Sequence, residues 1–150
     1  MTPEIRPMQP ADLPGVIRVE RACQPHPWDE ARFCRELDNP LARLRVICDG
    51  ENLCGFMVCW QVAGEVEIQN ICVSPEYRRK GLGRLLLEDL FNSCPDVERF
   101  LLEVRSGNQA GIELYRSFGF QVDGVRPAYY HDGEDAVLMS RPGASTLPGE

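Results

Sequence analysis

The sequence contains no long hydrophobic run. Its longest apolar stretch lies at 53–60 and already includes Gly55, so it is far shorter than the roughly 20 residues that a membrane-spanning helix needs. The first residues, 1–6, include Glu4 and no apolar segment, unlike a secretory signal peptide. We therefore expect a cytoplasmic protein that neither spans a membrane nor is exported.

The sequence also lacks the cysteine and histidine spacing of metal sites. Its 7 cysteines are an odd number, no C-x-x-C motif occurs, and neither of the 2 histidines, His26 and His131, has metal-site spacing to a cysteine. Four cysteines lie within apolar runs, namely Cys48, Cys54, Cys59 and Cys72. We expect these cysteines to be reduced thiols of the core, and we expect no bound metal.

Positive charge is scarce relative to negative charge. The chain has 16 lysines and arginines against 23 aspartates and glutamates, a net charge of −7. Because affinity for nucleic acids comes largely from neutralising phosphates, this balance disfavours a nucleic-acid partner and favours a basic or neutral substrate.

Length and composition are those of an ordinary globular domain. A chain of 150 residues can bury roughly 70% of its unfolded surface around one core. Hydrophobic residues make up 43% and charged residues 26%, close to average usage. We expect one domain over 1–140 and a flexible tail, rich in Pro, Gly and Ser, at 141–150.

Hydrophobic periodicity, caps and turns predict the order of helices and strands. The expected elements are a strand at 4–8, helices from 10 and from 29, strands at 43–48, 53–62 and 65–73, a helix from 82, a strand at 99–105, a helix from about 108, and strands at 120–130 and 136–140. The turn at 49–52 makes a hairpin of its neighbours. This mixed order predicts α/β layers around one mixed sheet.

The strand that follows the hairpin has a fault in its alternation. Val66 and Ile68 share one face, whereas Ile71 and Val73 fall on the other. A β-bulge near Asn70 would explain this shift and would leave backbone groups unpaired for a ligand. The alternative is a strand whose end is buried on both faces.

A basic, glycine-containing turn at 78–83 follows this strand and opens a helix. The free N–H groups and the positive end of the helix dipole make such a turn an anion site. Gly81 and Gly83 allow close approach of a pyrophosphate. A Rossmann loop would need glycine where Leu86 stands, and no Walker motif occurs. The alternative is a solvated basic turn.

The order of motifs resembles the GNAT family of acetyl-CoA-dependent N-acetyltransferases. The resemblance is carried by Arg-x-x-Gly-x-Gly after an apolar strand, then Glu103-Val104-Arg105, Asn108, Tyr115 and Gly119-Phe120. Further positions resemble the RimI type: Pro27-Trp28, Asn70-Ile71, Leu102, Arg126, Tyr129-Tyr130, Glu134-Asp135-Ala136 and Met139. Two residues depart from the family, because Gly107 stands where serine is common and Gly111 where alanine is expected.

The resemblance implies a fold and an activity. The fold is a mixed, mostly antiparallel sheet with helices on both faces and a splayed central strand pair. The activity is direct acetyl transfer from acetyl-CoA to the N-terminal α-amine, in the RimI type that of alanine in a small-subunit ribosomal protein, without an acyl-enzyme. The implied cofactor-binding residues are the backbone of Ile71, Cys72 and Val73 for pantetheine, Arg78, Arg79, Lys80, Gly81, Leu82 and Gly83 for pyrophosphate, and Asn108.

Two residues are candidates for proton transfer. Glu103 lies in the apolar run 100–104, where an unpaired carboxylate would be costly to bury, so it faces either a cleft or a basic partner. The resemblance favours a base for the ammonium, acting directly or through water. Tyr115 has a phenol suited to protonating the leaving thiolate; its alternative is a tyrosine of the core.

The candidate substrate-binding residues are aromatic or acidic: Trp28, Tyr129, Tyr130, Glu134 and Asp135. Aromatic rings suit peptide side chains and carboxylates suit an ammonium or basic segment, although the tyrosines also fit folding roles. Deprotonating an α-amine at pH 7 costs about 1.4 kcal/mol against about 4.6 kcal/mol for lysine, which favours an N-terminal substrate. Alternatives are a GNAT enzyme for a small amine or lysine, and a non-catalytic acyl-CoA-binding module.

Overall fold

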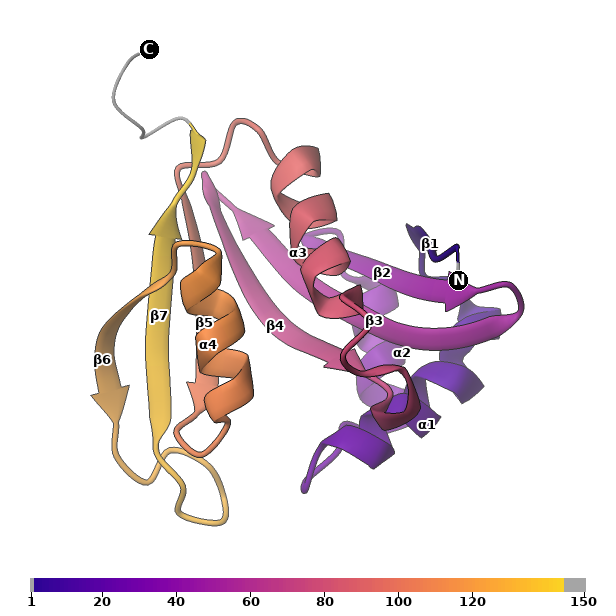
Figure 1. The fold of residues 1–150 in the computed structure, drawn as a ribbon, viewed down its shortest axis with the longest axis horizontal. Coiled ribbons are helices and arrows are strands. Elements are labelled where there is room, and N and C mark those ends of the chain that lie inside the picture. The colour runs from indigo at the N-terminus through magenta and orange to yellow at the C-terminus, as the bar shows by residue number, and fades with distance from the viewer. Residues whose placement is uncertain (1, 145–150) are drawn as a thin grey trace. The chain divides into compact units, whose positions relative to one another are not determined.

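The computed structural model describes residues 2–144, which form a seven-stranded sheet and four α-helices (Figure 1). The elements are β1 (Glu4–Pro7), the 3-10 turn η1 (Pro10–Asp12), α1 (Leu13–Cys23), α2 (Glu30–Asp38), β2 (Ala42–Asp49), β3 (Asn52–Val62), β4 (Glu65–Val73), the 3-10 turn η2 (Pro75–Tyr77), α3 (Leu82–Ser93), β5 (Arg99–Arg105), α4 (Gln109–Ser117), β6 (Gln121–Arg126) and β7 (Ala136–Pro142). The strand order is β1-β2-β3-β4-β5-β7-β6, with β4 and β5 parallel. The predicted mixed, mostly antiparallel sheet is confirmed.

The chain divides into two compact units, and one boundary between them falls within β4. The first unit holds residues 2–61 and 69–93, and the second holds 62–68 and 94–144. The predicted domain, 1–140, spans both units and stays a prediction. None of the helices in residues 2–144 is long and apolar enough to cross a membrane.

In the first unit, helices cover both faces of the strands. Figure 1 shows α3 in front of β2 and β3, with α1 and α2 behind them. The core on the α1 and α2 side is fully buried at Val16, Phe33, Val46 and Phe56. The rings of Phe33 and Phe56 meet edge to face at 5.5 Å between centroids. This packing fixes α2 against the β2–β3 hairpin, whose tight turn has Gly50 at φ +60°.

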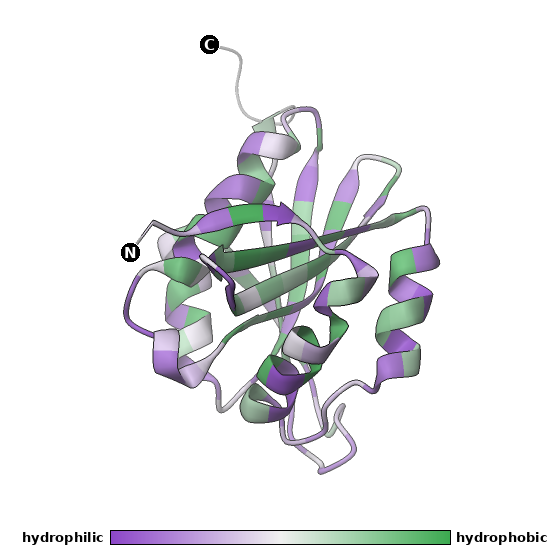
Figure 2. Cartoon of the chain, turned by 90° about the vertical axis from the view of Figure 1, so that its right-hand side faces the viewer, coloured by the Kyte–Doolittle hydropathy of each residue, from purple (hydrophilic) through white to green (hydrophobic). Residues whose placement is uncertain are grey.

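The buried face of α3 differs from the predicted one at three positions. The sequence favoured a stripe of Leu82, Leu85, Leu86, Leu90 and Phe91. In the structure Leu82, Leu86, Leu87 and Leu90 are buried, whereas Leu85 is 36% exposed and Phe91 only partly buried. Residues advance by about 100° around a helix, so Leu85 and Leu87 flank the 82–86–90 row at equal angles on opposite sides. The helical period therefore does not decide which of the two is buried, and packing in the folded protein buries the Leu87 side. In Figure 2 the helix ribbons accordingly carry both purple and green segments.

Burial alternates along β4 without a break. Val66, Ile68, Asn70 and Cys72 are buried, and the residues between them are at least partly exposed. The fault in the apolar pattern therefore arises because polar Asn70 occupies a buried position and Ile71 does not. A bulge is not needed to account for it.

In the second unit, only the first part of β4 pairs with β5. The parallel ladder runs from Glu65 with Arg99 to Ile68 with Leu102. Antiparallel β7 pairs with all of β5, and β6 pairs with β7, and Figure 1 shows α4 in front of β5. The predicted cap of α4 is confirmed, because the side-chain Oδ1 of Asn108 accepts a hydrogen bond from the N–H of Gly111 at 3.0 Å.

Two predicted boundaries near the C-terminus are wrong. β6 ends at Arg126 and not at Tyr130, since Pro127 has no N–H for a ladder and Ala128 adopts φ +48°. β7 continues beyond Ser140 to Pro142, because Arg141 and Pro142 pair with β5 and the N–H of Gly143 donates to the carbonyl of Glu98 at 2.7 Å. Of the expected tail, 145–150 lie outside the described residues.

Candidate functional site

The predicted strand–turn–helix arrangement is present in the first unit. β4 ends at Val73, the turn at 78–81 contains Arg79 at φ +63° and Gly81 at φ +77°, and α3 starts at Leu82. A Cβ added at Gly81 would meet nothing within 4 Å, so the turn leaves open space beside its backbone. The first N–H groups of this long helix have no partner within the helix, which is the geometry that holds anions.

Arg78 lies back on the end of the strand. Its Nε donates to the carbonyl of Val73 at 3.3 Å, and its Nη2 donates to the Sγ of Cys23 at 3.4 Å. Arg79 and Lys80 are exposed, and the Lys80 ammonium lies 5.6 Å from the ring centre of Tyr77. Two of the three predicted cations are therefore free to face solvent anions, and the third is bound to the protein.

The three residues predicted to bind pantetheine, 71–73, differ in burial and in the contacts that they already make. Ile71 is partly buried, whereas Cys72 is buried, with its Sγ 3.4 Å from a carboxylate oxygen of Glu20. The carbonyl of Val73 accepts from Arg78 and also from the thiol of Cys23 at 3.3 Å. The backbone that the resemblance assigns to pantetheine is therefore partly occupied by side chains of the first unit.

Glu20 of α1 is a site residue that the sequence reasoning did not select. It is fully buried, and its Oε1 accepts from the amide of Asn70 at 3.0 Å, while its Oε2 accepts from the backbone N–H of Trp28 at 3.0 Å. Gln24 also donates to Asn70 and Cys72, at 3.4 Å each. One carboxylate thus ties α1, the segment at 24–28 and β4 together. The sequence feature that could have identified Glu20 is its position among the apolar residues of α1.

Trp28 is half-buried, as expected for a residue with a structural side. Its ring lies 5.3 Å from that of Phe33 between centroids, and the Arg32 guanidinium covers it at 3.8 Å. Its part in substrate binding stays a prediction.

Glu103 lies in the second unit with a partly exposed carboxylate. Its side chain is 27% exposed, and the nearest arginine nitrogen, Nη1 of the exposed Arg126, is 3.7 Å away. The neighbouring Glu103 carboxylate raises the pKa of the Tyr129 phenol. Both interpretations of Glu103 therefore have support, because it forms an ion pair and remains open to solvent.

Tyr115 occupies a core position in the second unit. It is 7% exposed, and its ring packs edge-on against Phe120 at 5.8 Å. This packing fixes the ring, and proton donation by its phenol stays a prediction. Asn108, the predicted cofactor-binding residue, caps the same helix. Its Oδ1 accepts the hydrogen bond of the cap, so its side-chain N–H2 is the group left for a ligand.

The loop between β6 and β7 carries four of the predicted substrate-binding residues. Tyr129 is 47% exposed and meets Tyr130 edge-on at 5.2 Å. Burial raises the pKa of Tyr130, whose ring the Arg105 guanidinium covers at 4.1 Å. These contacts orient the tyrosine pair; they do not test whether it binds a peptide.

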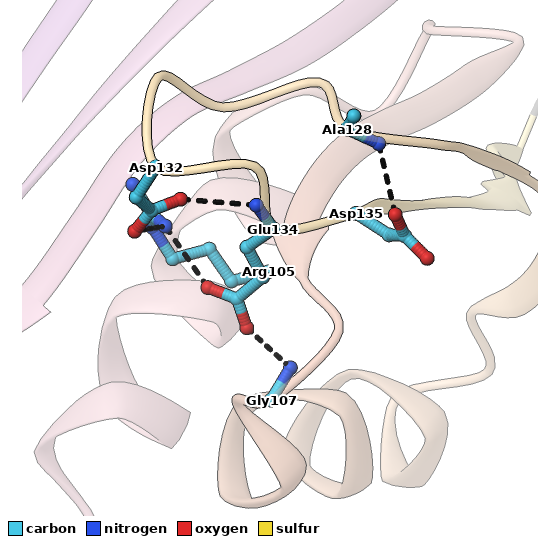
Figure 3. A network of polar contacts seen from close by, with 6 residues as sticks. All are labelled: Arg105, Gly107, Ala128, Asp132, Glu134 and Asp135. Atoms are coloured by element: carbon cyan, nitrogen blue, oxygen red, sulfur yellow. Dashed lines mark hydrogen bonds and ion pairs between the residues drawn. The ribbon is translucent and has the colours of Figure 1, made fainter.

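The acidic residues of this loop bind groups of the protein (Figure 3). The Nη1 of Arg105 donates to Asp132 at 2.8 Å and to Glu134 at 2.9 Å. The second oxygen of Glu134 accepts the N–H of Gly107 at 2.8 Å, and Asp135 accepts the N–H of Ala128 at 2.9 Å. The structure thus gives Glu134 and Asp135 loop-holding contacts that the sequence reasoning missed.

These contacts explain the two glycines that depart from the family pattern. A Cβ at Gly107 would lie 2.7 Å from the Oε2 of Glu134, and a Cβ at Gly111 would lie 2.6 Å from the side-chain nitrogen of Asn108. Both distances are too short for a real contact, so each glycine makes room for a side chain that binds the backbone there. Among residues 2–144, no cluster of three or more His, Cys, Asp or Glu is arranged to hold a metal ion.

Comparisons with known proteins agree with this geometry. The family model "Acetyltransferase (GNAT) family" matches residues 13–120. The [ribosomal protein bS18]-alanine N-acetyltransferase of Escherichia coli (strain K12) is 35% identical over 143 residues, which cover 92% of this chain and 96% of that protein. The N-alpha-acetyltransferase RimI of Mycobacterium tuberculosis is 38% identical over 120 residues, or 77% and 75% of the two chains.

The fold matches a solved structure over nearly its whole length. The crystal structure of the ribosomal-protein-S18-alanine N-acetyltransferase from Escherichia coli has a TM-score of 0.89 and 33% identity, and it covers 99% of this chain and 97% of that chain. Since the family model spans more than half of the chain and the relatives span most of it, this protein belongs to the GNAT family of acetyltransferases.

Proposed function

We propose that this protein transfers an acetyl group from acetyl-CoA to the N-terminal α-amine of alanine in ribosomal protein bS18. The observation that carries the proposal is the likeness to the Escherichia coli enzyme of that name, which extends over 92% of this chain. A ribosomal substrate also agrees with the net charge of −7, because an acidic enzyme attracts an ammonium group or a basic segment. It fits the cytoplasmic location expected from the sequence.

We assign acetyl-CoA binding chiefly to the first unit. The N–H groups at Gly81, Leu82 and Gly83 bind the diphosphate, with help from Arg79 and Lys80, because α3 begins there with open space beside the turn. The backbone of β4 at its last three residues pairs with the pantetheine arm as an added strand does. Asn108 of α4 offers its side-chain N–H2 to the cofactor.

Arg78 exchanges partners in this scheme. It now donates to the carbonyl of Val73 and to the Sγ of Cys23. A diphosphate is a stronger acceptor than a carbonyl, because its oxygens are ionised and accept an arginine in a bidentate pair. When Arg78 turns to the diphosphate, it frees the Val73 carbonyl for an amide N–H of pantetheine.

The proton transfers are assigned to two residues of the second unit. Glu103 takes the proton of the α-ammonium, directly or through water, since its carboxylate is the partly exposed one on β5. Tyr115 donates a proton or hydrogen bond to the coenzyme A thiolate. Neither step needs a cysteine nucleophile, and the base has little to do, because an α-amine of pKa about 8 costs only about 1.4 kcal/mol to deprotonate at pH 7.

The decisive experiment measures acetylation of a peptide copied from the bS18 N-terminus, by mass spectrometry after incubation with acetyl-CoA. Acetylation at the α-amine is expected, and the same peptide with a blocked N-terminus must stay unmodified. A lysine-containing blocked peptide and a polyamine test the alternative substrates. Modification of either one in preference to the free N-terminus would contradict the proposal.

Variants then separate chemistry from binding. We expect Glu103→Gln and Tyr115→Phe each to lower kcat by roughly 10²-fold or more, while the Kd for acetyl-CoA changes little. Glu113→Gln is the matched control, since Glu113 is an exposed carboxylate of α4 with no assigned role. An equal loss of cofactor binding in both variants would show that they act through the fold.

A further inference from the structure

Two cysteines that the proposed reaction does not use as nucleophiles lie together in the first unit. Cys23 is the last residue of α1, and Cys72 belongs to β4. The Sγ of Cys23 lies 3.3 Å from the carbonyl of Val73, and the Sγ of Cys72 lies 3.4 Å from the side-chain nitrogen of Gln24. Each thiol therefore contacts the chain neighbour of the other. Both are free thiols.

The two sulfur atoms have unequal surroundings. The neighbouring Cys72 thiol and the Arg78 guanidinium, which lies 3.4 Å from the Cys23 sulfur, hold the pKa of Cys23 well below that of an ordinary thiol. Its neighbour Cys23, together with burial, raises the pKa of Cys72. Cys23 is only partly buried and Cys72 is buried. A partly exposed thiolate beside an arginine, with a second thiol in contact, is the arrangement of reactive cysteine pairs.

Other cysteines of the chain lack one or more of these features. Burial raises the pKa of Cys48 and of Cys54, which makes them poorer nucleophiles at neutral pH. Cys34 of α2 is exposed, and it serves as a reference for exposure alone.

We propose that Cys23 and Cys72 form a redox-sensitive pair that a peroxide converts into a disulfide. The thiolate of Cys23 attacks one oxygen of hydrogen peroxide, the O–O bond breaks, and the departing hydroxide takes up a proton, leaving Cys23 as a sulfenic acid. The thiol of Cys72 then attacks that sulfur and releases water. In total two thiols lose two electrons and two protons, and one peroxide becomes two molecules of water.

The disulfide changes the segment assigned to acetyl-CoA, and this step rests on the proposed function. Bond formation draws the Sγ of Cys72 away from Glu20 and Asn70, which it now contacts at 3.4 Å each. It also fixes the end of α1 to β4, whose last residues pair with pantetheine in our scheme. Because a disulfide imposes its own Cβ–Cβ distance and torsion, we expect the KM for acetyl-CoA to rise at least several-fold while the protein stays folded.

The test treats the full chain with a small excess of hydrogen peroxide, blocks the remaining thiols and maps disulfides in a non-reduced digest by mass spectrometry. The expected result is a linked pair of peptides containing Cys23 and Cys72, two hydrogens lighter than the separate peptides, that dithiothreitol separates. Cys23→Ser must abolish the link. Cys72→Ser must abolish it as well. Cys72→Ala, which places no hydroxyl in the buried position, is the second variant and keeps the proposal testable if Cys72→Ser folds poorly.

Cys34→Ser is the matched control, with the link and the basal activity unchanged. A link from Cys23 to another cysteine, or oxidation of Cys34 at the same rate as Cys23, would overturn the proposal. A Cys23–Cys72 link that leaves the KM for acetyl-CoA unaltered would overturn its effect on the cofactor. If the reduced chain acetylates no amine at all, the proposed function fails, whereas the mapped link still answers the question of the disulfide.

Discussion

In each unit a polar network holds a loop in place, and the two networks differ in solvent exposure. In the first unit, the carboxylate of Glu20 is fully buried and binds the segment at 24–28 and β4 to α1. In the second, the side chains of Arg105, Asp132 and Glu134 are 19%, 38% and 30% exposed and bind the β6–β7 loop to β5. Both networks position segments that carry predicted substrate-binding residues, yet only one of them excludes water.

Exposure determines what each network contributes to stability. A buried donor that loses its acceptor costs about 1–3 kcal/mol, because no water replaces the lost bond. An ion pair at the surface contributes only about 0.2–1 kcal/mol, since water solvates both charges when the pair breaks. We therefore expect the first unit to depend on a single carboxylate and the second to tolerate the loss of one.

The largest effect is expected for Glu20→Ala. This change leaves the partly buried backbone N–H of Trp28 and the buried amide of Asn70 without their acceptor. At about 1–3 kcal/mol for the buried donor and up to as much for the other, the free energy of unfolding falls by roughly 2–6 kcal/mol. Urea denaturation measures it. Glu20→Gln keeps one acceptor oxygen and should lose less.

Glu134→Ala is the matched control in the second unit, because it also removes a carboxylate that accepts hydrogen bonds from protein groups, here the Arg105 guanidinium and the Gly107 N–H. Its expected loss is below about 1 kcal/mol. If the two alanine variants lose the same stability, burial does not distinguish the networks and the comparison is wrong.

The sequence showed the elements of both units better than it showed these networks. The bounds of β4 and β5 were predicted as they stand, because an apolar run between turn residues depends on nearby sequence alone. The role of Glu20 was not predicted, because its partner Asn70 is 50 residues away, and a glutamate on an apolar stripe does not reveal what it contacts. The end of β6 was misjudged although Pro127, which has no N–H for a ladder, marks it in the sequence. Only the contact of Asp135 with Ala128 had to await the folded loop.

The candidate site was predictable where backbone conformation forms it. The turn at 78–81 and the cap at Asn108 follow from local residue types, and both are present. The contacts of Arg78 with Cys23, and of Glu134 with Gly107, join segments 55 and 27 residues apart. A single sequence contains no pattern of residue spacing that identifies such distant contacts.

A smaller effect is expected for Gly107→Ala, and it tests how tightly the exposed network is built. The new Cβ would lie 2.7 Å from the Oε2 of Glu134, so the carboxylate must leave the Gly107 N–H, at a cost of about 0.5 kcal/mol, the lower end for one hydrogen bond. In a Glu134→Ala chain the same change should be nearly neutral. A double-mutant cycle by urea denaturation measures the coupling, and a coupling near zero would mean that the loop moves aside freely.

The smallest effect is expected for the ion pair of Arg6 and Asp12. This pair tests whether solvent exposure or the unit in which a contact lies determines its contribution to stability. Arg6 and Asp12 belong to the first unit, like Glu20. The Asp12 side chain is 10% exposed, but the Arg6 side chain is 43% exposed, so water reaches the guanidinium, whose two nitrogens donate to Asp12 at 2.7 and 2.8 Å. The Arg6 hydrogen bonds hold the pKa of Asp12 below its ordinary value. If exposure determines the energy, Asp12→Asn should cost about 1 kcal/mol or less at pH 7, close to Glu134→Ala and far from Glu20→Ala.

The pH dependence checks the cause of that loss. A carboxylate whose pKa is lowered by folding stabilises the protein above its unfolded pKa of about 3.9, and this contribution disappears as the pH falls through the lower folded value. The stability difference between the wild-type chain and Asp12→Asn should therefore be constant from pH 7 to about pH 5 and shrink below about pH 4. Urea denaturation at pH 7 and at pH 3 measures it. A difference that persists unchanged at pH 3 would show that Asp12 acts through its packing, or through its contact with the N–H of Gln9 at 2.7 Å, and not through its charge.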